Sequence, residues 1–194
     1  MLAVVGSVAF LAGRAKPHSG GSGTVNAASS SSATSSSSAT QLPGAAAMTT
    51  LGSYLARSAA VRPTVQNAIN AVQACSESPS SGAATLQRAI STRQDILHGL
   101  ATLDVSALPN GAQLVSALTI AMNNSLDADN DYHAWMADLV SSGSTCGSNP
   151  NQDSNYVAGG NASAAATTSK DAFLTIWNPM APRYGQRTYS DTGF

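Results

Sequence analysis

Three basic residues occupy positions where apolar residues are expected, and they are the strongest candidates for binding chemistry in this sequence. Arg62, Arg93 and Lys170 each lie in the middle of a segment whose apolar residues recur at steps of three or four. Asp129 lies at the edge of another such stripe, beside Ser125. Because a buried charge needs a partner, we expect these charged side chains to meet one another or a ligand.

Two interpretations of these four charged residues, which we call the polar layer, remain open from the sequence. In the first, they form a structural ion-pair layer that fixes helix register, while the long Lys and Arg stems carry their charges outward. In the second, they border a pocket for a small anion, because three bases share one acid, with Asp171 as a candidate second acid. Predicted helix boundaries are uncertain by two to four residues, so the positions of the four side chains along the bundle axis are uncertain by the same amount.

Two patterns for metal binding are weaker. Asp127–Asp131 (DADND) partly matches a calcium loop, but Tyr132 stands where the turn needs Gly, and Asp138 replaces the bidentate Glu. Asp129 and His133 have the i, i+4 spacing of helical metal ligands, without a second pair to complete a site. We therefore expect solvated helix faces here and no metal.

No motif for catalysis or for a cofactor is present in the sequence. It lacks a Gly-x-Ser-x-Gly elbow, a phosphate-binding loop and a dinucleotide fingerprint, and neither cysteine has the features of an activated thiol. The net charge is -1, and only 10% of the residues are charged, so no basic surface favours nucleic acid. We expect no enzyme and no cofactor, and as partner an envelope protein or a small ligand.

Four helical segments must position these residues. The longest of them, with its apolar positions on one face, would be about 45 Å long and could not bury that face alone. Short connections favour antiparallel neighbours, so we predict an all-α, up-down-up-down four-helix bundle. The predicted segments are Met48–Cys75, Ala83–Leu103, Pro109–Ser142 and Asp153–Trp177.

Local signals predict where these helices begin, bend and end. Thr49 or Thr50 is the candidate N-cap of the first segment, and Pro63 predicts a kink or two abutting helices within it. Residues 78–82 (SPSSG) predict a turn before the second segment. Asn178-Pro179 is expected to end the fourth segment.

The two cysteines support the bundle. In an up-down-up-down arrangement the first and third helices end at the same pole, which places Cys75 and Cys146 in neighbouring loops. A disulfide there is sterically reasonable and indicates an oxidising compartment. The alternative is two unrelated free thiols in a cytosolic protein.

The N-terminal part is typical of a membrane anchor followed by a stalk. Residues 1–13 are apolar but too few to span a bilayer, so we interpret them as a signal peptide or a truncated signal anchor; a buried helix is the alternative. Arg14 and Lys16 oppose export, because basic residues favour the cytoplasmic side. Residues 14–47 predict a disordered Ser/Gly/Ala-rich linker, 48–179 the bundle, and 180–194 a tail whose aromatic residues pack on it.

The domain resembles uncharacterised membrane-anchored or secreted helical proteins of actinobacteria. The resemblance is carried by the Ser/Ala-rich linker, the two loop cysteines, the stretch Phe173–Pro179 (FLTIWNP) and the following Arg183–Gly185 (RYG). It implies an extracytoplasmic domain without a known activity. We therefore expect an envelope binding or scaffold module, tethered to the membrane through its N-terminal segment only. The alternative is a sensing bundle that binds a small anion at the polar layer.

Overall fold

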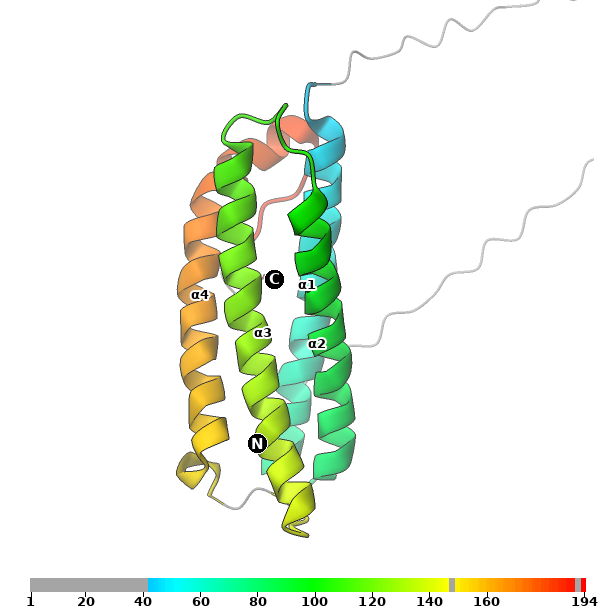
Figure 1. Ribbon diagram of the computed structural model, residues 1–194, viewed down its shortest axis with the longest axis vertical. Helices are drawn as coiled ribbons and strands as arrows, with labels where there is room; N and C mark the ends of the chain where they lie inside the picture. Colours follow the sequence, from blue (N-terminus) through cyan, green and yellow to red (C-terminus); the bar gives the residue numbers. More distant parts are fainter. Residues whose placement is uncertain (1–41, 147–148, 191–192) are drawn as a thin grey trace, which may run out of the picture. The chain divides into compact units, whose positions relative to one another are not determined.

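The computed structural model describes residues 42–146, 149–190 and 193–194, and within them it contains helices and no strands. The predicted leader, residues 1–13, lies outside this range, as does most of the predicted linker. The all-α prediction with four long helices is confirmed. The helices are α1 (Ala45–Gln73), α2 (Pro79–Thr102), α3 (Gly111–Ser141) and α4 (Ser154–Met180), with short 3₁₀ helices η1 (Pro150–Gln152) and η2 (Ala181–Tyr184) (Figure 1).

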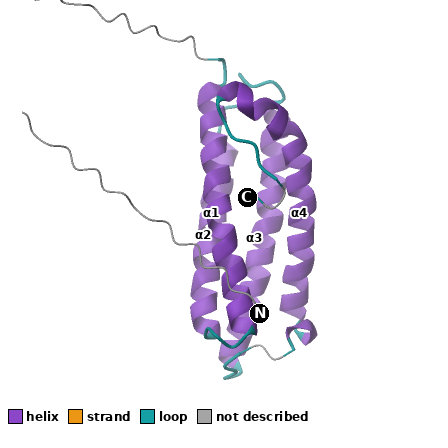
Figure 2. Cartoon of the chain, turned by 180° about the vertical axis from the view of Figure 1, so that it is seen from behind, coloured by secondary structure: helices purple, strands orange, loops and turns teal. Residues whose placement is uncertain are grey.

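Helices that follow one another in the chain also pack against one another. The central helix α3 packs against both α2 and α4, and α1 packs mainly against α2. Figure 1 shows the chain reversing its direction from each helix to the next. Direct contacts between α1 and α4 are few. The segment that follows η2 turns back along the helices, as the view from behind shows (Figure 2).

The apolar core is divided into two clusters along the length of the helices. One contains Leu55 of α1, Ile96 of α2 and Phe173 of α4. The other contains Val65 of α1, Ala89 of α2 and Trp135 of α3. On α1, α2 and α3, residues of the polar layer lie between the residues of the two clusters. The apolar stripes thus pack as predicted above and below a charged level.

The helix beginnings differ from the prediction. α1 begins at Ala45, after Gly44 in a left-handed conformation (φ 80°), and no side chain caps it. Thr49 and Thr50 lie inside the helix, where their hydroxyls donate to the carbonyl oxygens four residues earlier. The predicted turn at residues 78–82 is wrong: Ser78 caps α2 by accepting a hydrogen bond from Ser81 N, so most of that stretch is the first helical turn.

Both interior prolines lie within continuous helices. α1 passes through Pro63 without division, so the prediction of two abutting helices is wrong. Likewise, Pro179 does not end α4, which continues to Met180 and into η2. Both prolines are exposed, so water can satisfy the helix carbonyl groups that lose a donor there.

The predicted disulfide is present. Cys75 follows α1, Cys146 follows α3, and their sulfur atoms are bonded with the Cα atoms 4.9 Å apart. The alternative of two free thiols is therefore wrong. None of the helices in the described ranges combines the length and the apolar character needed to cross a membrane.

Candidate functional site

The polar layer is built around a buried ion pair between α2 and α3. Arg93 Nε donates to Asp129 Oδ2 at 2.6 Å, and Arg93 Nη1 donates to Ser58 Oγ at 3.2 Å. Arg93 is only 4% exposed and Asp129 only 2%. Burial raises the pKa of the Asp129 carboxyl even though the Arg93 guanidinium opposes this. The pKa direction means that desolvation outweighs the attraction to arginine, as is common for buried pairs.

Small side chains leave the space that the charged residues require. Ser58 of α1 is fully buried opposite Arg93, and Ser125 of α3 turns its hydroxyl onto its own helix, at Ala121 O. Ala128 of α3 and Ala166 of α4 are also buried. The interior at this level is therefore lined by short side chains, which cannot fill it by themselves.

Lys170 enters the same layer from α4. Its Nζ donates to the main-chain oxygen of Phe194 at 2.6 Å and lies 5.3 Å from the centre of the Phe194 ring. Burial, followed by the charges of Arg93 and Arg62, lowers the pKa of the Lys170 amine to about 7, although Asp129 acts in the opposite direction.

A cavity of about 110 Å³ opens beside these groups. Engineered cavities of roughly 150 Å³ hold a benzene molecule, so this one has room for a ligand slightly smaller than six carbon atoms in a ring. Gln66 of α1 and Thr167 of α4 are lining residues that are also exposed, which places the mouth between α1 and α4. The lining residues are Arg62, Val65, Gln66, Ile69, Arg93, Ser125, Ala128, Asp129, Tyr132, Ser163, Ala166, Thr167 and Lys170.

The cavity wall is chemically divided. Its three cationic side chains come from α1, α2 and α4, and its one described carboxylate, Asp129, is already bound by Arg93. Val65 and Ile69, one and two turns along α1 from Arg62, supply an apolar surface towards the second core cluster. Such a wall can neutralise a small anion at one end and enclose an apolar group at the other.

All four predicted residues of the polar layer line this cavity. Asp171, the candidate second acid, is exposed on α4 and does not line it. Sequence reasoning gave neither Ser58 nor Ser125 a role, although a small polar residue among large apolar ones is a signal for a buried partner. Nothing in the sequence predicted Phe194 as the partner of Lys170, because the tail has no periodicity to place it.

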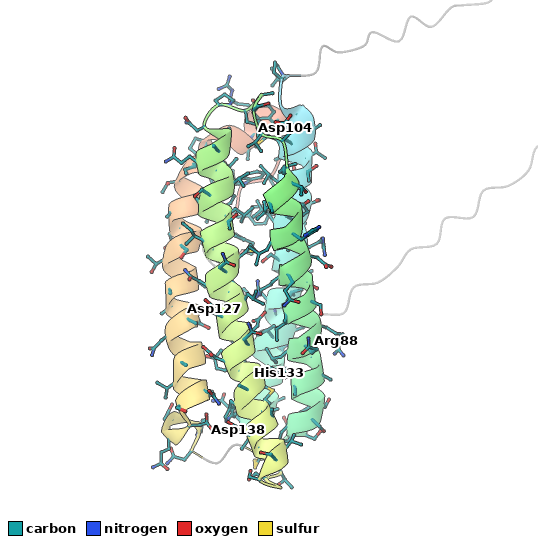
Figure 3. All side chains as sticks on the ribbon, in the orientation of Figure 1. Arg88, Asp104, Asp127, His133 and Asp138 are labelled. Atoms are coloured by element: carbon teal, nitrogen blue, oxygen red, sulfur yellow. A yellow bond between two sulfur atoms is a disulfide. The ribbon has the colours of Figure 1, made fainter. Side chains whose placement is uncertain are left out.

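The predicted metal patterns have no converging geometry. α3 is helical from Asp127 through Asp138, so these two positions lie about 16 Å apart along the axis. Figure 3 shows them at different heights on the helix. Asp129 faces Arg93 rather than an open ligand position. Among the described residues, no group of three His, Cys, Asp or Glu side chains could hold a metal ion.

Comparison with known proteins identifies no relative of this chain. No family model, no curated protein and no solved structure matches the chain. The function is therefore inferred from the geometry and the charges of the cavity.

Proposed function

We propose that this chain is a non-catalytic binding module outside the cytoplasm, in which an up-down-up-down four-helix bundle takes a small anion at its polar layer. In this proposal, the N-terminal segment tethers the module to the membrane. The observation that carries the proposal is the cavity bordered by Arg62, Arg93 and Lys170. The Cys75–Cys146 disulfide supports a place in an oxidising compartment.

A protein-docking or scaffold role is less well supported by the surface. That role would use exposed aromatic residues of the tail, yet Phe194 is fully buried, and Tyr184 and Tyr189 are partly buried against the first core cluster. The exposed large apolar residues of α3, Ile120 and Val140, are 20 positions apart and thus about 30 Å apart along the helix. They do not form a continuous patch of the kind that marks an interface.

A purely structural ion-pair layer accounts for Arg93 and Asp129, but it does not account for the open volume beside them. Lys170 is also buried, and its amine donates to the main-chain oxygen of Phe194, the last residue of the chain as given. A register-fixing layer also needs no open volume, whereas about 110 Å³ lies next to Lys170. This open volume beside cationic side chains suits a site that takes an external anion.

The test is thermal unfolding of the full oxidised chain with a panel of small anions at pH 6.5. Acetate, butyrate, sulfate and nitrate are compared with chloride at equal ionic strength. An anion present at ten times its Kd stabilises by about 1.4 kcal/mol, which corresponds to a Tm increase of roughly 3–6 °C. If no anion raises Tm above the chloride control, the proposed function is wrong.

A matched pair of variants locates the binding site. Ala166→Leu places a larger side chain into the cavity wall and should abolish the anion-dependent increase in Tm. Ala164→Leu makes the same change at an exposed position of α4 and should leave that increase intact. An equal response in both variants would place anion binding elsewhere on the molecule.

A further inference from the structure

We propose that the pocket around Phe194 is a recognition site for a polypeptide that ends in phenylalanine, and that the chain's own tail fills it as an intramolecular ligand. The ligand class is a terminal phenylalanine with a free carboxylate. This site shares Lys170 with the anion cavity, but the inference does not depend on the proposed function.

The side chain of Phe194 is enclosed by the first core cluster. Phe194 is 0% exposed, and Phe173 and Trp177 of α4 belong to the same cluster. The rings of Phe173 and Tyr189 lie nearly edge-on to the Phe194 ring, with centroids 5.5 and 5.7 Å away. Edge-to-face contacts of this kind stabilise beyond the burial of apolar area. The pocket therefore favours an aromatic side chain over an aliphatic one.

The main chain of Phe194 is held by a buried cation. Lys170, which is 6% exposed, donates from Nζ to the main-chain oxygen of Phe194 at 2.6 Å. The same Nζ lies 5.3 Å from the centre of the Phe194 ring. Phe194 is the last residue of the chain as given, and at a terminus this oxygen belongs to a carboxylate. One ammonium group thus contacts both the charge and the ring of a terminal phenylalanine.

α4 also binds the main chain of the tail. The Asn178 side chain accepts from Tyr189 N at 3.0 Å and donates to Tyr189 O at 2.9 Å. Trp177 Nε1 donates to Arg187 O at 3.0 Å. Peptide-recognition domains combine main-chain hydrogen bonds, which supply affinity, with a pocket that supplies specificity. The α4 surface has both elements.

The tail is laid onto this surface as a separate segment that runs back along α4. Gly185, with φ 67°, follows η2 at the reversal, and the view from behind shows the returning chain (Figure 2). Arg187 and Tyr189 contact the last turns of α4, whereas Phe194 contacts residues one to two turns earlier. Because Phe194 is fully buried, a residue after it would have to begin inside the domain. The geometry therefore suits a chain terminus.

Carboxypeptidase A tests the occupancy of the pocket in the full oxidised chain. This enzyme takes a terminal aromatic residue and its carboxylate into its own active site, so it can release Phe194 only while the tail is detached. A synthetic peptide of residues 186–194 is the unprotected control. Release from the folded chain should be about 100-fold slower than from the peptide. Release as fast as from the peptide would overturn the proposal.

Conversion of the terminal carboxylate to an amide tests the recognition of charge. The amide keeps the ring and the main-chain oxygen of Phe194 and removes only the negative charge. Hydrogen exchange at Tyr189 N, whose described acceptor is Asn178, reports detachment of the tail. Exchange should be at least about tenfold faster in the amide, because hydrogen bonds between charged groups are the stronger ones. Equal exchange in the two forms would show that no free carboxylate is recognised and would overturn the proposal.

Two matched pairs separate recognition from general packing. The extension Gly-Ser-Gly-Ser after Phe194 should expose Tyr189 N to exchange, whereas the same extension before Met1 should not. Lys170→Met should accelerate the release of Phe194 by at least about tenfold, whereas Lys16→Met, outside the described residues, should leave it unchanged. Equal behaviour within either pair contradicts the proposal. The carboxypeptidase and amide experiments need no substitution and remain decisive if Lys170→Met fails to fold.

A small probe tests the ligand class directly. In Phe194→Gly the tail keeps its length but loses its ring, so an added ligand can enter the pocket. N-acetyl-L-phenylalanine at ten times its Kd should raise the Tm of this variant by roughly 3–6 °C. N-acetyl-L-phenylalanine amide and N-acetyl-L-alanine, which lack the charge and the ring respectively, should not raise it.

The Ala166→Leu substitution distinguishes this site from the anion cavity. Added to Phe194→Gly, it should leave the response to N-acetyl-L-phenylalanine intact, because it alters the cavity wall and not the Phe194 pocket. Loss of the response would assign the probe to the cavity and overturn this inference while leaving the proposed function. Failure of the small-anion panel, with the tail protected as described, would overturn the proposed function and leave this inference.

Discussion

Removal of the Asp129 carboxylate should destabilise the protein far more than removal of the whole ion pair. In Asp129→Ala, the Arg93 guanidinium, which is 4% exposed in the native protein, keeps only its described hydrogen bond to Ser58. Breaking one side of a buried pair typically costs about 3–5 kcal/mol. A domain of this size has a total stability of roughly 5–15 kcal/mol, so the variant should lie near its unfolding threshold.

The double variant Arg93→Met/Asp129→Leu should be close to wild type or more stable. It fills a similar volume with apolar atoms and leaves no buried charge, and such replacements are often neutral or stabilising by about 1–4 kcal/mol. The raised pKa of Asp129 agrees with this expectation, because it shows that desolvation exceeds the attraction within the pair. Only the Ser58 hydroxyl loses its described partner, at a cost of about 1 kcal/mol.

Urea unfolding, followed by tryptophan fluorescence, measures both effects, since Trp135 and Trp177 are buried in different core clusters. With a slope of about 2 kcal/mol/M, the single variant should lose roughly 2 M in its midpoint, and the double variant should recover most of it. A loss below about 1 kcal/mol in Asp129→Ala would refute the reasoning. So would a double variant as unstable as the single one.

Three further predictions address the rest of the domain. Because the Lys170 pKa is lowered to about 7, the folded state binds fewer protons than the unfolded state between about pH 7 and 10.5. The free energy of unfolding without ligand, measured in urea, should therefore increase by up to about 5 kcal/mol as the pH rises through this window. Lys170→Met should remove this pH dependence. The native chain should show an intact mass two hydrogens below that of the reduced chain, and reduction of Cys75–Cys146, 71 residues apart, should lower stability by about 4 kcal/mol. Gly159→Ala should destabilise by about 1–3 kcal/mol, because its Cβ would lie 3.0 Å from a tyrosine ring of α3, whereas Gly160→Ala, with its nearest atom at 3.9 Å, should stabilise by up to about 1 kcal/mol; thermal unfolding compares the two.

The helices were predictable because their signal is local. Apolar residues at steps of three and four depend only on neighbours within one segment, and these stripes became the two core clusters. Helix ends were predicted less well, since residues such as proline can mark the start of a helix, a turn or the end of a helix. Pro79 serves as the first residue of a helix rather than as part of a turn, and Pro179 is tolerated because α4 is exposed there.

The candidate site was predictable in its members but not in its contacts. A charged residue within an apolar stripe is visible from the sequence, which identified Arg93 and Lys170. Their partners lie on other elements, 36 residues away in the case of Asp129 and 24 residues away in the case of Phe194. Pairings of this kind depend on how the helices are rotated about their axes and on the path of the tail. No repeating pattern in the sequence reports either of them.

The energetics of the polar layer fit the proposed binding role better than a stabilising role. An apolar replacement of the Arg93–Asp129 pair is expected to be at least as stable as the pair itself. Lys170 adds a further cost near neutral pH, because burial disfavours its charged form. The disulfide contributes about 4 kcal/mol in the opposite direction, which is of the same order as the cost of the buried pair. An anion that binds in the cavity would stabilise the folded state by mass action, so the layer should be most stable when occupied.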